Sequence, residues 1–253
     1  MISAVLFDLD GTLIETEELK ALSYARAAAK LRPGEIVEDE VVDAYADDLV
    51  GRSREEIATT LMHHFGLEEV SRERMTEADG GEPWRAFVRV RLGVYEKLLE
   101  DGELLLRQRY MHNIELVRRM RGEGYPTALA TMSHRYQVEK MLPVIGLEEA
   151  FDVVATMDDV QRGKPDPEID LLVAKKMGIP PEEFLVIEDS PAGVGAAIAA
   201  GMAVIAVPTR LTIKGLRAAG IPEPRWMVED PQTLPSVVRE RIEDAGGRRK
   251  ETR

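Results

Sequence analysis

The sequence predicts an α/β protein in which helices cover both faces of a parallel β-sheet and a helical domain is inserted after the first strand. Short runs rich in β-branched residues recur along the chain, and they are apolar almost throughout instead of alternating with polar residues. Such runs are typical of parallel strands buried between two helical layers. The expected strands are residues 4–8, 127–131, 152–156, 184–188 and 203–207.

The region between the first two strands predicts a separate helical domain. It contains amphipathic helical patterns such as LKALSYARAAAKL and WRAFVRVRLGVYEKLL, and no convincing strand. We therefore expect a catalytic core made of residues 1–14 and 108–245 and a cap domain of residues 15–107. Residues 246–253 are polar, contain glycine and end in basic residues, which favours a flexible tail.

Composition narrows the classes of partner. With 44% apolar and 31% charged residues the chain has the make-up of a soluble globular protein. The net charge of −13 argues against a general affinity for nucleic acid or anionic membranes, because such partners need a clustered positive field. The absence of cysteine and of an N-terminal signal pattern fits a cytoplasmic protein. The sequence leaves the oligomeric state open, with a monomer as the default.

One uncharged stretch, GVGAAIAAGMAVIAVP at residues 193–208, resembles a membrane span. It is shorter than the ~20 apolar residues that a spanning helix needs. Gly201 divides it, so we expect a helix, a turn and a strand.

Polar side chains follow three of the expected strands at the points where those strands end. In open parallel sheets, reactive groups collect at the carboxyl ends of the strands. We therefore expect several carboxylates, a hydroxyl and an ammonium group to meet at one edge of the sheet. The residues concerned are Asp8, Asp10, Thr131, Lys164, Glu188 and Asp189.

Four carboxylates in one small site need compensation, because like charges raise the pKa values of their neighbours. Mg²⁺ suits this set, since it binds oxygen ligands and keeps waters for contact with a phosphate. Histidine-bound zinc is not supported, because His63 and His64 are adjacent on an expected helix and face different directions. Mg²⁺ is therefore the expected cofactor.

With a cation and a lysine present, a carboxylate can act as a nucleophile towards phosphorus. Asp8 is the candidate nucleophile, because Lys164 would offset its repulsion from phosphate oxygens. Asp10 could protonate the leaving group and later accept a proton from the attacking water. Thr131 would bind the transferring group, and Gly11 would allow backbone amides to approach it.

Each of these signals also has an ordinary structural interpretation. Asp-x-Asp-Gly often forms a turn, Thr131 could simply end a strand, and Lys164 could be a solvated loop residue. Ser190 can cap a helix that begins at Pro191. What favours chemistry is the joint order of the residues, since the acids and the threonine fall at strand ends and Lys164 lies between them in the sequence.

These segments resemble the haloacid dehalogenase superfamily over essentially the whole chain. FDLDGTL is similar to its first motif, LAT to its second, the lysine of GKPDP to its third and IEDSPAGVGAAIAAG to its fourth. The resemblance implies a Rossmann-like, three-layer core with a helical cap, an aspartyl-phosphate on Asp8 and acid/base work by Asp10. It also implies that Mg²⁺ is held by Asp8, the backbone carbonyl of Asp10, and Asp189, with Glu188 bound directly or through water. Thr131 and Lys164 would bind the phosphoryl group.

Within the superfamily, the cap segment VGRSREEI resembles the branch that contains β-phosphoglucomutase and sugar-phosphate phosphatases. In that branch the arginine, here Arg54, would meet the non-reacting end of the substrate. Lys20 stands where the mutases have a histidine, and Val50 where they have a lysine. Lys20, Arg54 and Ser133 are therefore candidate substrate-binding residues, although Lys20 and Arg54 could also be ordinary solvated charges.

The leading hypothesis is a Mg²⁺-dependent phosphoric monoester hydrolase that acts on a small phosphorylated metabolite, with a sugar phosphate as the expected substrate. The departures from the mutase pattern favour this hypothesis over the alternative, a β-phosphoglucomutase-like phosphomutase. A more remote alternative is a non-catalytic, phosphorylation-receiver-like module. Such modules are shorter, and they lack both a cap and a second acid two residues after the acceptor.

Overall fold

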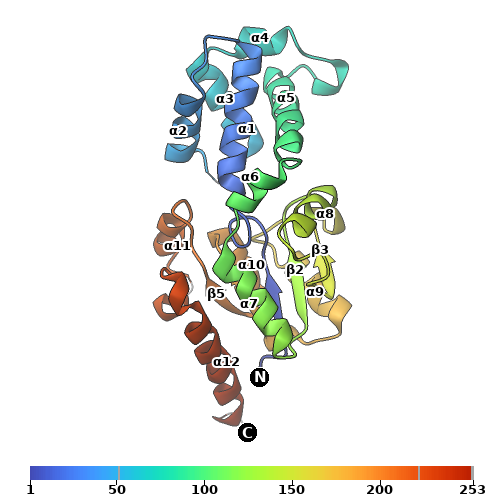
Figure 1. The fold of residues 1–253 in the computed structure, drawn as a ribbon, viewed down its shortest axis with the longest axis vertical. Helices are drawn as coiled ribbons and strands as arrows, with labels where there is room; N and C mark the ends of the chain where they lie inside the picture. The colour runs from blue at the N-terminus through green and yellow to red at the C-terminus, as the bar shows by residue number, and fades with distance from the viewer. Residues whose placement is uncertain (51, 222, 252–253) are drawn as a thin grey trace. The chain divides into compact units, whose positions relative to one another are not determined.

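The computed structural model describes residues 1–50, 52–221 and 223–251, which form two compact units (Figure 1). One unit comprises Met1–Glu15 and Leu105–Arg253, and the other comprises Thr16–Leu104. The sequence placed the corresponding boundaries after residues 14 and 107. The chain therefore leaves the first unit shortly after one strand and returns to it for the remaining four.

The first unit contains a five-stranded parallel sheet in the order β3-β2-β1-β4-β5, which confirms the predicted α/β fold. The strands are β1 (Ala4–Phe7), β2 (Thr127–Ala130), β3 (Val153–Ala155), β4 (Phe184–Glu188) and β5 (Ala203–Ala206). In the central strand, Val5 lies opposite both Thr127 and Leu185. Because the strand order reverses at β1, the carboxyl ends of β2, β1 and β4 lie side by side at the switch point where ligands bind in such sheets.

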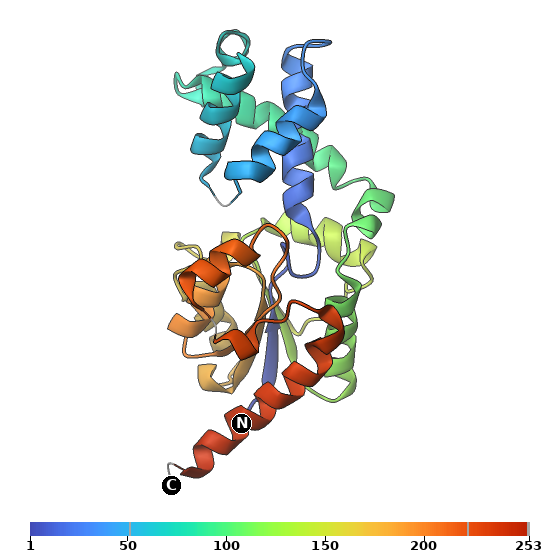
Figure 2. The ribbon, with the colours of Figure 1, turned by 90° about the vertical axis from the view of Figure 1, so that its left-hand side faces the viewer.

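Helices cover both faces of the sheet and complete three layers (Figure 2). Helices α9 and α10 pack on one face, and α7 and α12 pack on the other. The helices of this unit are α7 (Met111–Gly122), α8 (Arg135–Val144), α9 (Glu168–Met177), α10 (Pro191–Ala199), α11 (Ile213–Ala219) and α12 (Leu234–Glu251). Short 3₁₀ turns lie at η2 (Met157–Asp159), η3 (Pro181–Glu183), η4 (Pro224–Trp226) and η5 (Pro231–Thr233).

The sheet is apolar on both faces because it is buried on both. Every residue of β1 is fully buried, and Ala4 and Leu6 face a cluster that includes Val173 of α9 and Val194 of α10. This double burial explains why the strands are continuous apolar runs in the sequence. It also fixes β1 firmly, so that the residues just beyond its end have a defined place.

The uncharged stretch at residues 193–208 folds as expected. It forms most of α10, a turn and β5, with Gly201 at a φ of 77°. No helix in the part of the chain that the structure describes is long and apolar enough to cross a membrane.

The segment for which the sequence predicts a flexible tail, residues 246–253, includes the end of helix α12, and its flexibility stays a prediction. Helix α12 continues through Glu251, and residues 252 and 253 lie outside the described residues. Its first turns are anchored by the buried side chains of Leu234 and Val238, which stand four residues apart on one face. The polar composition of the segment therefore did not prevent a helix that had already started from continuing.

The second unit is helical, and its described residues contain no strand. Its helices are α1 (Thr16–Leu31), α2 (Glu38–Asp48), α3 (Arg54–Phe65), α4 (Glu68–Arg72) and α5 (Pro83–Leu98), with a 3₁₀ turn at η1 (Glu77–Asp79). Helix α6 (Gly102–Arg107) runs across the boundary between the units. The apolar side of α1 packs against α2 and α5, where the ring of Tyr24 lies 5.8 Å from that of Tyr45 and 5.7 Å from that of Phe87.

The two connections of the first unit are tied to each other by backbone hydrogen bonds. Glu15 N donates to Gln108 O (2.8 Å), and Tyr110 N donates to Leu13 O (3.0 Å). The side-chain amide of Asn113 at the start of α7 donates to the carbonyl of Thr12 (2.6 Å). These bonds hold in place the loop that follows β1 and contains Asp10.

Candidate active site

Asp8 is the first residue after β1, and its backbone is still part of the sheet. Its N–H donates to Ile187 O (3.0 Å), so the ladder with β4 continues one residue beyond the strand. The side chain is only 5% exposed, and its Oδ1 accepts a hydrogen bond from Lys164 Nζ (2.8 Å). Both the backbone and the carboxylate of Asp8 are therefore held.

Lys164 joins three elements of the site. Its Nζ donates to Asp8 Oδ1 (2.8 Å), Glu188 Oε2 (2.7 Å) and the carbonyl of Ala130 (3.0 Å). The three protons of the ammonium group thus have three acceptors, which come from the ends of β1, β4 and β2. Because the lysine side chain is only 7% exposed, water screens these interactions weakly.

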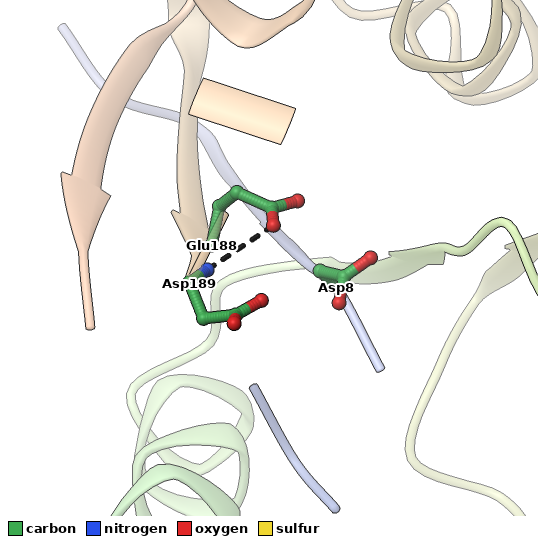
Figure 3. Close-up of side chains that lie close together, drawn as sticks. All are labelled: Asp8, Glu188 and Asp189. Carbon is green, nitrogen blue, oxygen red and sulfur yellow. Dashed lines mark hydrogen bonds between the residues drawn. The ribbon is translucent and has the colours of Figure 1, made fainter. Parts of the chain in front are cut away.

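Glu188 and Asp189 stand at the end of β4. Glu188 Oε1 accepts hydrogen bonds from Asp189 N (3.1 Å), Ser190 N (3.0 Å) and Ser190 Oγ (2.9 Å), so its orientation is fixed from its own strand end. One carboxylate oxygen each of Asp8, Glu188 and Asp189 lie within 4.8 Å of one another (Figure 3). The ends of two neighbouring strands therefore build one compact set of buried oxygen ligands.

Two glycines make room for these carboxylates. Gly11 has a φ of 82°, and a Cβ atom there would lie 2.3 Å from Asp189 Oδ2. A Cβ atom on Gly193 would lie 2.0 Å from Glu188 Oε2. In the structure Gly193, on α10, thus leaves space for the side chain of Glu188.

The electrostatics of the cluster show a surplus of negative charge. Burial raises the pKa of Asp8 well above its usual value, the charge of Glu188 raises it further, and Lys164 opposes the shift. Burial alone would lower the pKa of Lys164, but the charges of Asp8 and Glu188 outweigh it and raise that pKa instead. Both shifts favour additional positive charge at the site. The three buried carboxylates, which offer only oxygen ligands, fit a hard divalent cation such as Mg²⁺.

Asp10 is held by two hydroxyl groups that come from the end of β2. Thr131 Oγ1 donates to Asp10 Oδ2 (2.9 Å), and Ser133 Oγ donates to the same oxygen (2.7 Å). The sequence suggested contacts between these hydroxyls and a substrate, but in this structure both contact the carboxylate of Asp10. The expected acid/base residue thus lies beside the expected phosphoryl-binding residue.

The other two candidates belong to the helical unit. Lys20 on α1 forms an ion pair with Glu17 (2.5 Å), and the second oxygen of Glu17 accepts a hydrogen bond from Tyr45 Oη (2.7 Å). Arg54 is the exposed first residue of α3, directly after Ser53, which caps that helix together with Glu56. A role for Lys20 and Arg54 in substrate binding stays a prediction.

Sequence reasoning missed Asp170. This residue on α9 is 1% exposed, and neither carboxylate oxygen has a hydrogen-bond partner among the described residues. Burial raises its pKa to about 6; the charge of Lys164 opposes the shift and that of Glu188 adds to it. A signal was present in the sequence, because an acid at position 170 interrupts the apolar side of a helix formed by Ile169, Val173 and Ala174.

The chain is similar in sequence to known proteins over most of its length. The sequence pattern of the family described as "Haloacid dehalogenase-like hydrolase" matches residues 5–207. The chain is 32% identical over 203 residues to the phosphorylated carbohydrates phosphatase of Thermotoga maritima, a match that covers 79% of this chain and 82% of that protein. It is 33% identical over 220 residues to the chloroplastic Protein SUPPRESSOR OF QUENCHING 1 of Arabidopsis thaliana, which covers 87% of this chain but only 19% of that protein.

One solved structure has a similar fold over nearly the whole chain. The crystal structure described as a "putative beta-phosphoglucomutase" from Thermotoga maritima superposes with a TM-score of 0.72 at 27% sequence identity, covering 94% of this chain and 99% of that one. The family pattern spans the strands that carry Asp8, Thr131 and Glu188. The chain belongs to the haloacid dehalogenase-like hydrolase family.

Proposed function

We propose that the protein is a Mg²⁺-dependent phosphatase that hydrolyses a small phosphorylated metabolite through an aspartyl-phosphate on Asp8. The observation that carries this proposal is the position of Asp8, which lies in hydrogen-bond contact with Lys164 and beside Glu188 and Asp189 at the switch point of the sheet. The three carboxylates, with the backbone carbonyl of Asp10, would hold Mg²⁺. The bound ion would neutralise charge on the phosphate and on the carboxylates.

In the first half of the reaction, a carboxylate oxygen of Asp8 attacks phosphorus while the bond between phosphorus and the leaving oxygen breaks. Asp10 transfers a proton to that oxygen, so the product leaves as an alcohol. Lys164, which already contacts Asp8, reduces the repulsion between the carboxylate and the phosphate oxygens. The hydroxyl of Thr131, which donates to Asp10 in this structure, would turn to the transferring group.

In the second half, water attacks the phosphorus of the aspartyl-phosphate. Asp10, now ionised, accepts a proton from that water, and the bond between phosphorus and the Asp8 oxygen breaks. Inorganic phosphate leaves, and Asp8 and Asp10 return to their starting protonation states. Asp8 and Asp10 thus act in both halves, and no further reactant besides water is needed.

A sugar phosphate is the substrate class that we propose. The support is the 32% identity to a phosphatase of phosphorylated carbohydrates over four fifths of this chain. Lys20 and Arg54 are the residues that we propose to contribute to recognition of the non-reacting part of the substrate. Their positive charges suit a polar or anionic group.

Phosphate release from a panel of phosphorylated metabolites tests the proposal. Activity is expected with Mg²⁺ and should be lost on chelation and in Asp8→Asn, which removes the nucleophile while keeping the size of the side chain. Asp10→Asn should lower kcat by about 10²–10⁴-fold and change substrate binding little. Unchanged circular dichroism would show that the variants are folded, and full activity of folded Asp8→Asn would refute the mechanism.

A phosphomutase is the second candidate, favoured by the similarity to the structure described as a putative beta-phosphoglucomutase. A mutase would return the phosphoryl group to its product, so a trace of sugar bisphosphate should speed isomerisation more than phosphate release. The phosphatase proposal expects the opposite, that phosphate appears at the rate at which substrate disappears. Following both products by phosphorus NMR in one reaction decides between the two.

A further inference from the structure

Two hydroxyl groups converge on a single oxygen of Asp10, and one of them belongs to Ser133, which takes no part in the reaction steps proposed above. Ser133 Oγ donates to Asp10 Oδ2 (2.7 Å), which also accepts from Thr131 Oγ1 (2.9 Å). We infer that Ser133 is a positioning residue for Asp10. By holding Oδ2, it fixes which of the two carboxyl oxygens of Asp10 gives up the proton. The inference rests on the proposed function, in which Asp10 is the acid and base.

The hydrogen-bond network gives each proton a defined direction. The backbone N–H of Ser133 donates to Thr131 Oγ1 (3.0 Å), so the single hydroxyl proton of Thr131 is free to point to Asp10. The hydroxyl proton of Ser133 points to the same acceptor. With two donors on Oδ2, the acidic proton of Asp10 belongs on Oδ1, because a proton on Oδ2 would compete with both.

Ser133 is itself held in place. It lies between β2 and α8, it is 8% exposed, and its carbonyl accepts a hydrogen bond from Met157 N (3.2 Å). Its hydroxyl therefore starts from a backbone that is tied on both sides, in surroundings where hydrogen bonds are strong. If Thr131 turns its hydroxyl to the phosphoryl group, Ser133 is the member of this pair that stays on Asp10.

This role differs from the substrate contact suggested by the sequence, and the leaving group of the substrate distinguishes the two roles. A sugar or alkyl phosphate needs proton donation from Asp10 as its bond to phosphorus breaks, whereas p-nitrophenolate leaves without it. For Ser133→Ala we expect kcat/KM for an alkyl phosphate to fall about ten-fold, and kcat/KM for p-nitrophenyl phosphate to fall less than about two-fold. A hydroxyl that binds the phosphate would affect both substrates alike.

A double-mutant cycle gives the decisive comparison, because it asks whether Ser133 acts through Asp10. In the Asp10→Ala background, adding Ser133→Ala should change kcat/KM for the alkyl phosphate by less than about two-fold. A ten-fold loss that persists in that background would overturn the inference. An equal loss for the two substrates in the single variant would overturn it as well.

Matched variants separate positioning from folding. Ser133→Thr keeps the hydroxyl and should retain most of the activity on the alkyl phosphate, and Ser133→Cys serves if Ser133→Ala does not fold. Ser71→Ala removes a buried hydroxyl of the helical unit that has no hydrogen-bond partner among the described residues, and it should leave both substrates unaffected. A wild-type protein without phosphatase activity would sink the proposed function. An active wild-type protein with an additive cycle would sink only the role of Ser133.

Discussion

Compared with the wild type, the Asp170→Asn variant should be more stable at neutral pH than at acidic pH. The reason is that the wild-type carboxylate is buried without a hydrogen-bond partner among the described residues. Its pKa is about 6 in the folded protein, against an ordinary value of 3.8. At 1.36 kcal/mol per pKa unit, this difference corresponds to about 3 kcal/mol of folding free energy. Asparagine has nearly the same size and cannot ionise, so it should remove this dependence on pH.

The sign follows from proton binding. The folded state holds the Asp170 proton more tightly than the unfolded state, so the stability gained from that proton is fully present below pH 3.8. It is lost as the pH rises through about 6, where the buried carboxylate ionises. The free energy of unfolding of Asp170→Asn minus that of the wild type should therefore increase from about pH 4 to about pH 7 and then level off.

Urea unfolding in the presence of a chelator measures this difference at several pH values. Asp43→Asn is the matched control, since it changes an exposed carboxylate on α2, and its difference from the wild type should stay small throughout. Any constant penalty for burying the asparagine amide shifts the whole curve without changing its slope. A flat curve for Asp170→Asn between about pH 5 and pH 8 would refute the reasoning, because the buried carboxylate would then have a partner in solution.

Three further predictions concern the carboxylate cluster. Mg²⁺ at a concentration 100 times its Kd should stabilise the wild-type protein by about 2.7 kcal/mol and so raise its melting temperature. It should have little effect on Asp189→Asn, and equal shifts in the two proteins would place the ion elsewhere. Gly193→Ala should lower the free energy of unfolding by about 1–3 kcal/mol and weaken the response to Mg²⁺, because the added methyl carbon would meet the carboxylate of Glu188; urea unfolding with and without Mg²⁺ measures both effects. Lys164→Met should keep the volume of the side chain and abolish phosphate release, and significant turnover by this variant would show that the ammonium charge is dispensable.

The sheet could be predicted closely because its signals are local. A strand buried on both faces needs apolar residues at every position, and this pattern marked all five strands to within a residue at each end. The meeting of Asp8 with Glu188 and Asp189 could also be expected, since parallel strands bring their carboxyl ends to one edge. Composition did not indicate that α12 extends to Glu251.

Other features depend on contacts between distant segments, which no local pattern reveals. The hydrogen bond from Thr131 to Asp10 depends on the position of the loop from Asp10 to Glu15, which is held by Asn113 and Tyr110, about a hundred residues later in the chain. The sequence contained these residues, but it carried no sign that they meet.

Three unusual positions adjoin the charged cluster formed by Asp8, Lys164, Glu188 and Asp189. Gly11 and Gly193 leave no space for a Cβ atom because carboxylates fill it, and Asp170 is buried next to charges it does not bond with. A sequence under selection for stability alone would replace the buried acid at position 170 with an apolar residue of similar size. Departures of this kind are expected where function competes with stability. Burial and the charge of Glu188 raise the pKa of Asp8, and the charges of Asp8, Glu188 and Asp170 raise the pKa of Lys164; a cation would relieve this surplus of negative charge. The cost of burying these carboxylates together and the proposed affinity for Mg²⁺ thus have the same electrostatic cause.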